Sequence, residues 1–351
     1  MNLGRAGKVT LVVFGTVILL VIIAMTVLAI PRTPNSTRSL EFQGYISLPK
    51  GTRSRIFTAL DYITIDGSNL FVTNVLSGEV YNVRLRGDPA RDVPKVSVFS
   101  LEPQAHGVAV DPISHLGFVT RSEANTVDVF DPDKMQLIKR ISVAEGADAI
   151  IYDPYHKLIY ASNGEAKVAT LIDPVTLTNV GVIPLGGEPE FAVFDPQTHL
   201  IYQNLKDNDS VAVVDVATRS VVQRWPLPGC GMPTGATIDA AGRRLFVICG
   251  KTATFVALDL NTHQIVVSLP IGGLPDSVAY DPELRRIYTT GLAGVMSVIQ
   301  QNAPNTYRIL DTVRMHYGAH TLAVDPATHR VYAAYLSLFV RPRLAMFGPR
   351  P

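Results

Sequence analysis

The 351-residue sequence contains only two cysteines, Cys230 and Cys249. They can form at most one disulfide, which excludes a disulfide framework and a cysteine-based zinc cluster. An excess of charge is also missing, because 31 lysines and arginines balance 30 aspartates and glutamates. A near-neutral chain has no overall attraction for nucleic acid, and we expect no nucleic-acid partner.

Signatures of several enzyme classes are absent as well. The sequence has no Gly-x-Ser-x-Gly elbow, no His-Glu-x-x-His pair, no Walker-type phosphate loop and no haem-attachment cysteine pair. Amphipathic helical patterns of useful length are also missing from the body of the chain. The sequence therefore defines an architecture more clearly than an activity.

One long hydrophobic run is present, at residues 9–30. About 20 apolar residues in a helix span the hydrocarbon core of a bilayer, so we expect a transmembrane anchor there. A short cytoplasmic tail at 1–8 would precede it, and a polar linker at 31–40 would follow. The alternative is a cleavable signal peptide, although its hydrophobic region normally ends at about 15 residues.

The orientation of this anchor is less clearly encoded. Arg5 and Lys8 on one side are matched by Arg32 and Arg38 on the other, so the positive-inside count nearly ties. Signal anchors commonly leave a short N-terminal tail in the cytoplasm. We therefore expect a single-pass membrane protein whose body, residues 41–351, lies on the extracytoplasmic side, periplasmic or extracellular.

A repeat of 42 to 45 residues runs through this body. Its most regular element is an apolar-x-apolar-Asp-Pro motif, with degenerate copies at two positions. The repeat aspartates are Asp66, Asp111, Asp153, Asp195, Asp239, Asp281 and Asp325. This period is typical of a four-stranded propeller blade, and seven copies predict seven blades.

Each repeat contains four short strand signals rich in valine, isoleucine, phenylalanine and tyrosine. In the second copy they fall at residues 107–110, 116–120, 126–130 and 137–143. The last copy has only three, at 321–324, 331–335 and 344–347. Residues 44–49 resemble the missing fourth strand, so the sequence predicts an all-β, seven-bladed β-propeller whose N-terminal strand closes the last blade.

The residues of the repeats resemble those of the YVTN-repeat β-propeller family, part of a wider WD40-like and lactonase-type superfamily. The matching segments are residues 70–74 (Leu-Phe-Val-Thr-Asn), 117–120, 125–131 and 209–215. The resemblance implies a seven-bladed propeller of the kind found in periplasmic and surface-layer-type proteins of the cell envelope. It also implies that some relatives are lactonases and that many have no assigned activity.

Candidate site residues follow from the repeat, because the inner strands of a propeller converge on a central channel. Counting five residues back from each repeat aspartate gives the start of each inner strand. These ring residues are Asp61, His106, Asp148, Glu190, Thr234, Asp276 and His320. They predict a ligand-binding mouth, and the alternative is a polar lining that holds only water.

Three consecutive ring residues, His320, Asp61 and His106, form a predicted two-histidine, one-carboxylate set for a divalent metal ion. No other cofactor is indicated. Arg53 and Arg55, in the loop before the first inner strand, would clamp an anionic group or remain exposed charges. Cys230 and Cys249 would form a disulfide if the domain is exported, or remain two buried thiols.

Two functions are compatible with these features of the sequence. The first is a non-enzymatic platform that binds a protein, peptide or envelope ligand through its loop face and channel mouth. The second is a metal-assisted, lactonase-like hydrolase in which the carboxylates and histidines hold a divalent ion. We favour the platform, with no catalytic residue assigned.

Overall fold

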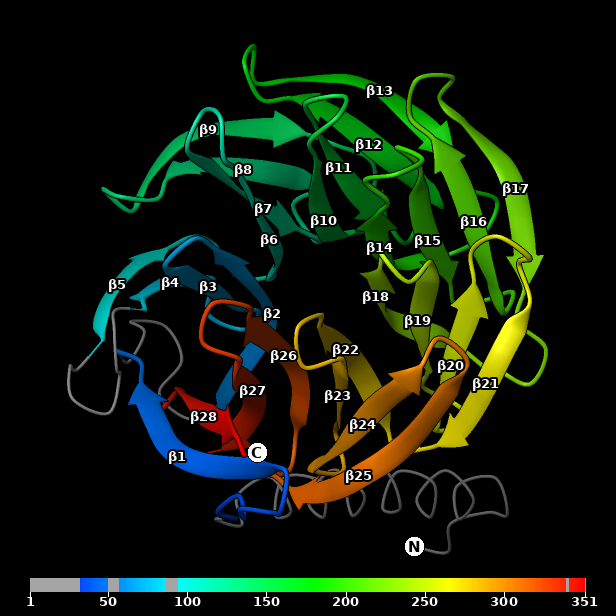
Figure 1. Ribbon diagram of the computed structural model, residues 1–351. Helices are drawn as coiled ribbons and strands as arrows, with labels where there is room; N and C mark the ends of the chain where they lie inside the picture. Colours follow the sequence, from blue (N-terminus) through cyan, green and yellow to red (C-terminus); the bar gives the residue numbers. More distant parts are fainter. Residues whose placement is uncertain (1–31, 50–56, 86–93, 339–340, 351) are drawn as a thin grey trace, which may run out of the picture.

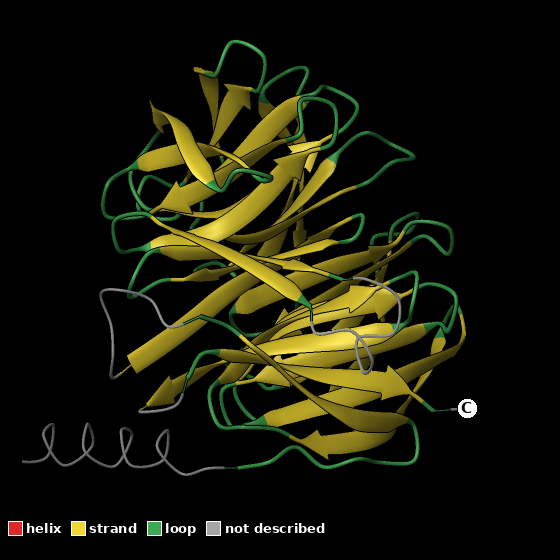
Figure 2. Cartoon of the chain, turned by 90° about the vertical axis from the view of Figure 1, so that its left-hand side faces the viewer, coloured by secondary structure: helices red, strands yellow, loops and turns green. Residues whose placement is uncertain are grey.

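The computed structural model describes residues 32–49, 57–85, 94–338 and 341–350. These residues form strands joined by turns and loops, as the side view in Figure 2 shows. No helix with the length and apolarity needed to cross a bilayer occurs in these ranges. The predicted tail at 1–8 and the predicted anchor at 9–30 lie outside the described residues.

The strands form five four-stranded antiparallel sheets and one eight-stranded sheet, which consists of two four-stranded units joined by a short strand pairing. We call the seven four-stranded units blades. Blade 1 contains β2 (Phe57–Asp66), β3 (Asn69–Asn74), β4 (Glu79–Arg84) and β5 (Lys95–Ser100). Blade 2 contains β6 (Ala105–Asp111), β7 (Leu116–Arg121), β8 (Thr126–Asp131) and β9 (Gln136–Ser142). Blade 3 contains β10 (Ala147–Asp153), β11 (Leu158–Asn163), β12 (Val168–Asp173) and β13 (Thr178–Pro184). Blade 4 contains β14 (Pro189–Phe194), β15 (Ile201–Leu205), β16 (Ser210–Asp215) and β17 (Ser220–Pro226).

The remaining three blades complete the ring. Blade 5 contains β18 (Pro233–Asp239), β19 (Arg244–Cys249), β20 (Thr254–Asp259) and β21 (Ile265–Pro270). Blade 6 contains β22 (Pro275–Asp281), β23 (Arg286–Gly291), β24 (Val295–Ala303) and β25 (Thr306–Arg314). Blade 7 contains β26 (Ala319–Asp325), β27 (Arg330–Leu338), β28 (Arg343–Pro349) and β1 (Leu40–Ser47).

Figure 1 shows the blades arranged around a central axis, with the first strand of each blade innermost. This arrangement is consistent with a β-propeller and confirms the prediction of an all-β body. The four strands predicted for the second repeat agree with β6 to β9 to within two residues. A short pairing of β2 with β27 also links the backbones of blades 1 and 7.

The pairing of β1 with β28 closes the last blade, as the sequence predicts. It runs from Leu40 opposite Pro349 to Ser47 opposite Arg343, so the strand starts four residues earlier than predicted. Leu40 is fully buried in a cluster that includes Phe347. The pairing register shifts between Phe42 and Gly44, and the φ of Gly44 is +121°, which is favourable only for glycine.

Part of the predicted linker at 31–40 lies against blade 6. The backbone N–H of Asn35 donates to the carbonyl of Arg314 at 3.2 Å, and the N–H of Arg314 donates back to Asn35 Oδ1 at 2.6 Å. The N–H of Ser39 donates to Asp311 Oδ2 at 2.7 Å. The segment before β1 is therefore held against β25 rather than separated from the blades.

The repeat aspartates have a structural role at the turns between first and second strands. Asp111 and Asp153 are buried, and their carboxylates accept hydrogen bonds from the backbone N–H groups two and three residues later. A residue with positive φ follows in each turn, such as His115 or Lys157. Aspartate suits this geometry because its short side chain reaches its own turn. The repeat therefore reflects hairpin formation rather than chemistry.

Buried aromatic side chains at the second strands pack one blade against the next. Tyr160, Tyr202 and Tyr288 are at most 2% exposed. Tyr202 of blade 4 shares a hydrophobic cluster with Leu245 of blade 5, and the other clusters also span neighbouring blades. The hydrophobic core therefore lies in the seams between blades.

The two cysteines form a disulfide in blade 5. The sequence left a disulfide and two buried thiols open, and the structure agrees with the disulfide. Their Cα atoms lie 5.1 Å apart, and both side chains are buried beside Trp225. The bond ties the segment before β18 to the last residue of β19. Residue Pro233, next to Thr234, lies opposite Cys249 in this hairpin.

Replacing a core residue of β1 should destabilise the whole ring. Leu40→Ala removes a buried side chain, and we expect a loss of about 2–5 kcal/mol in the free energy of unfolding. Glu41→Ala is the matched control, because this half-exposed residue makes only a surface ion pair with Arg350 and should change stability by less than about 1 kcal/mol. Urea unfolding of the full chain would measure both. Equal effects would contradict the closing role of β1.

Removing the disulfide should also destabilise the protein. The bond joins residues 19 positions apart, and a loop of that size is worth about 3 kcal/mol in the chain-entropy treatment. We expect Cys230→Ser/Cys249→Ser to lose about that amount. Urea unfolding with and without reductant gives the control, because reductant should lower the stability of the natural chain alone. If reductant also lowered the stability of the double variant, the loss of stability would have an origin other than the disulfide.

Candidate functional site

A β-bulge occurs near the start of every inner strand. The pairing register of β2 shifts between Leu60 and Ile63, and the inner strands of the other six blades shift at the equivalent place. A bulge leaves its extra residues unpaired and re-aims their side chains. In each blade the ring residue lies within the bulge. This local geometry presents the ring residues to the central axis.

Six of the seven ring residues line one cavity of about 110 Å³ at the centre of the ring. They are Asp61, His106, Asp148, Glu190, Asp276 and His320. Thr234, the ring residue of blade 5, is not among the residues that line it. Its side chain is 5% exposed and lies beside Gly250, where the absence of a side chain leaves room for it.

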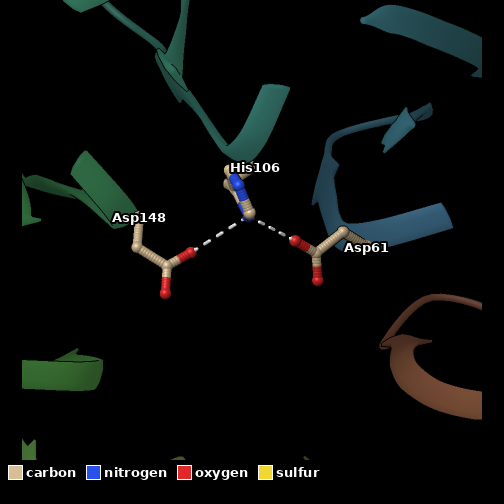
Figure 3. A group of neighbouring side chains, drawn as sticks. All are labelled: Asp61, His106 and Asp148. Carbon is tan, nitrogen blue, oxygen red and sulfur yellow. Dashed lines mark hydrogen bonds and ion pairs between the residues drawn. The ribbon is translucent and has the colours of Figure 1, made fainter. Parts of the chain in front are cut away.

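Asp61 lies at the centre of a hydrogen-bonded network in this cavity. Its Oδ2 is 2.9 Å from His106 Nδ1, and its Oδ1 is 3.3 Å from His320 Nε2. Figure 3 shows His106 between Asp61 and Asp148, whose Oδ1 is 3.5 Å from the same Nδ1. Burial alone would raise the pKa of Asp61, but the hydrogen bonds from the two histidines hold it well below the ordinary range.

Both ring nitrogens of each histidine face hydrogen-bond acceptors. His106 Nε2 lies 3.3 Å from Gln104 Oε1, and His320 Nδ1 lies 3.1 Å from the carbonyl of Gly318. An imidazole can donate from both nitrogens only when it is protonated. Burial opposes the charge, but the bonds to Asp61 outweigh it, and the pKa of each histidine is raised. The network therefore favours two imidazolium groups around one carboxylate.

Two of the other carboxylates, Asp148 and Asp276, titrate close to neutrality. Burial, together with the charge of Glu190, raises the pKa of Asp148 to about 7. Burial raises the pKa of Asp276 to about 6, although His320 opposes this shift. Burial also raises the pKa of Glu190, whose Oε1 is 2.5 Å from Lys206 Nζ. The cavity therefore gains negative charge as the pH rises through 6 to 7.

An aromatic pair forms part of the same cavity. The rings of Tyr62 and Phe191 stack with centroids 4.9 Å apart, and both side chains line the cavity. They come from blades 1 and 4 and therefore meet across the axis. Both also line a more apolar space of about 330 Å³ further along the channel. The pair separates the acidic cavity from this second space.

This aromatic pair was not predicted from the sequence, although a signal was present. The residue after each ring residue is, in blade order, Tyr62, Gly107, Ala149, Phe191, Gly235, Ser277 and Thr321. Five of these residues are small, and the two large aromatic residues distinguish blades 1 and 4 from the other blades. Lys206, which also lies 2.8 Å from Glu188 Oε1, was missed too. It follows a second strand, where no repeat pattern singles it out.

The structure revises the predicted metal set. Among the described residues, the group whose ligand atoms all lie within 4.8 Å of one another is Asp61, His106 and Asp148. His320 is therefore replaced by Asp148 in the candidate set. Two carboxylates and an imidazole suit a divalent ion, but His106 would first have to lose a proton. Arg53 and Arg55 lie outside the described residues.

Comparisons with known proteins support the fold but assign no family. The sequence matches no protein-family profile and no curated protein. A solved structure, a hydrazine synthase from Kuenenia stuttgartiensis, is similar with a TM-score of 0.71 and 18% sequence identity. The match covers 84% of this chain and 99% of that chain. At this identity the likeness concerns the fold alone, and it is consistent with a β-propeller.

Proposed function

We propose that this protein is a membrane-tethered, extracytoplasmic binding platform whose ligand presents a positively charged group to the central cavity. The observation that carries the proposal is the cavity itself, in which four carboxylates outnumber the two histidines around a volume of about 110 Å³. That volume suits a single ammonium or guanidinium group. The stacked Tyr62 and Phe191 add aromatic surface, which also favours cations.

The rest of the chain supports the tether and the location. The apolar run at 9–30 is long enough to anchor the chain, and the platform would follow it. The disulfide between Cys230 and Cys249 is typical of an oxidising compartment such as the periplasm or the cell exterior. The residues of the repeats support a relationship to the YVTN-repeat propellers. The partner would then be a protein, peptide or envelope component that carries a basic group.

The second candidate function is a divalent-metal-dependent hydrolase. The observation that favours it is the close group of Asp61, His106 and Asp148. A bound ion would polarise a carbonyl and activate water. Against it, His106 already faces acceptors with both ring nitrogens, so the ion must displace a proton and break the bond to Asp61. We therefore place the cationic ligand first.

A lysine analogue should bind the cavity through its charge. We expect Nα-acetyl-lysine methylamide to bind the full chain in calorimetric titration, whereas the neutral norleucine analogue should not. Asp148→Asn or Asp276→Asn keeps the shape of the side chain but removes a carboxylate, and each should weaken binding about ten-fold, or about 1.4 kcal/mol. Asp133→Asn is the control, because Asp133 is exposed in blade 2.

Two outcomes would contradict this proposal. Equal binding of the charged and neutral analogues would show that the carboxylates do not select the ligand. A stoichiometric divalent ion in the purified full chain, lost in Asp61→Ala and His106→Ala, would instead support the hydrolase.

Binding of the lysine analogue should strengthen as the pH rises from 5 to 8. Asp276, with a pKa of about 6, and Asp148, with a pKa of about 7, lose their protons across this range and become attractive to a cation. By linkage, cation binding at pH 6 to 7 should release protons, which appears as a dependence of the binding enthalpy on the buffer. The two asparagine variants should flatten the profile. A pH-independent affinity in the natural chain would contradict the assignment.

A further inference from the structure

Another pocket lies at the outer part of blade 6, beside the segment that leads into β1. Its volume is about 440 Å³. We call it the arginine pocket, and its polar lining residues are Arg38, Ser39, Arg286, Gln300, Arg308 and Asp311. Figure 1 shows the start of β1 next to β25 at the edge of the ring, well away from the inner strands. The arginine pocket is therefore separate from the central cavity.

The strand registers place this pocket at the end of blade 6 opposite the cavity. Arg286 pairs with Asp281 at the end of β22, whereas the ring residue Asp276 lies near its start. Gln300 lies opposite Arg286 in β24, and Arg308 lies opposite Gln300 in β25. These residues form a row across the blade. The segment with Arg38 and Ser39 covers one end of this row.

Three guanidinium groups meet at the pocket against one carboxylate. Arg38 and Arg308 are exposed, and neither guanidinium donates a hydrogen bond to another described residue. The charge of Arg38 acts on Asp311, whose pKa it helps to lower. Arg286 is held in place by the carbonyls of Ser39, at 3.3 Å, and Arg350, at 3.2 Å. The carboxylate of Asp311 is occupied by the backbone N–H and the hydroxyl of Ser39. The pocket keeps a net positive charge with unused donors.

We propose that the arginine pocket binds the phosphate of an anionic phospholipid headgroup. A planar guanidinium donates two parallel hydrogen bonds to a phosphate, and two guanidinium groups from separate segments can clamp it. The source is a lipid because Arg38 follows the apolar run at 9–30 by only eight residues. An extended chain of that length reaches about 29 Å at most, which keeps the pocket near the bilayer surface. The inference rests on the tether of the proposed function and not on its cavity.

The test is calorimetric titration of the full chain in a neutral detergent with dihexanoyl-phosphatidylglycerol below its micelle concentration. We expect saturable binding that is at least ten-fold tighter than that of dihexanoyl-phosphatidylcholine. Arg38→Gln/Arg308→Gln should lose at least ten-fold in affinity. The affinity of Arg38→Lys/Arg308→Lys for the lipid should lie between those of the natural chain and the glutamine variant, because lysine keeps the charge but not the two parallel donors. Arg140→Gln/Arg219→Gln removes the same charge from blades 2 and 4 and should bind normally.

Each other outcome has a defined meaning. Unchanged binding in Arg38→Gln/Arg308→Gln, or no binding in the natural chain, would overturn the proposal. Inorganic phosphate that binds as tightly as the lipid would show a free-phosphate site and contradict the lipid source. Binding of the lysine analogue to Arg38→Gln/Arg308→Gln shows that this variant is folded. If carbonate without detergent extracted the full chain from membranes, the proposed membrane anchor would be wrong, whatever the result at the arginine pocket.

Discussion

The pairing of β1 with β28 is the interaction on which the rest of the structure depends. It joins the two ends of the described chain into one blade, so blade 7 has a fourth strand and the ring is closed. Closure fixes a common axis for the inner strands, and the seams between blades then bury the aromatic side chains of the second strands. Without it, the ring residues would have no shared space in which to meet.

The convergence imposed by closure explains the unusual electrostatics of the cavity. Four carboxylates in a small volume repel one another, and the structure relieves the repulsion in three ways. Asp61 is neutralised by His106 and His320, Glu190 is paired with Lys206, and Asp148 takes up a proton near pH 7. The third of these, the protonation of Asp148, leaves the cavity able to exchange a proton for a positive ligand near neutral pH. The lining is therefore more specialised than a wet polar mouth requires.

Much of the fold could be predicted from the sequence because hairpin turns repeat strictly. An aspartate marks the end of each inner strand, with proline after it in five of the seven repeats, and the ring residues follow by counting five residues back from it. The details of the site depend on contacts between blades, which carry no local signal. Thr234 fits beside Gly250, Lys206 reaches Glu190 from the turn after a second strand, and Tyr62 meets Phe191 across the axis. Only the aromatic pair leaves a trace in the repeat, as two large residues among small ones.

The geometry of blade 6 connects the two proposed sites. The inner strand β22 begins near the cavity at Asp276 and ends at Asp281, opposite Arg286 of the arginine pocket. Seven strand residues cover about 23 Å, so the two sites occupy opposite ends of the blade. A bilayer bound at the arginine pocket would therefore lie on the side of the ring away from the start of the inner strands. The acidic cavity would then open away from the membrane, toward ligands that approach from the extracytoplasmic space.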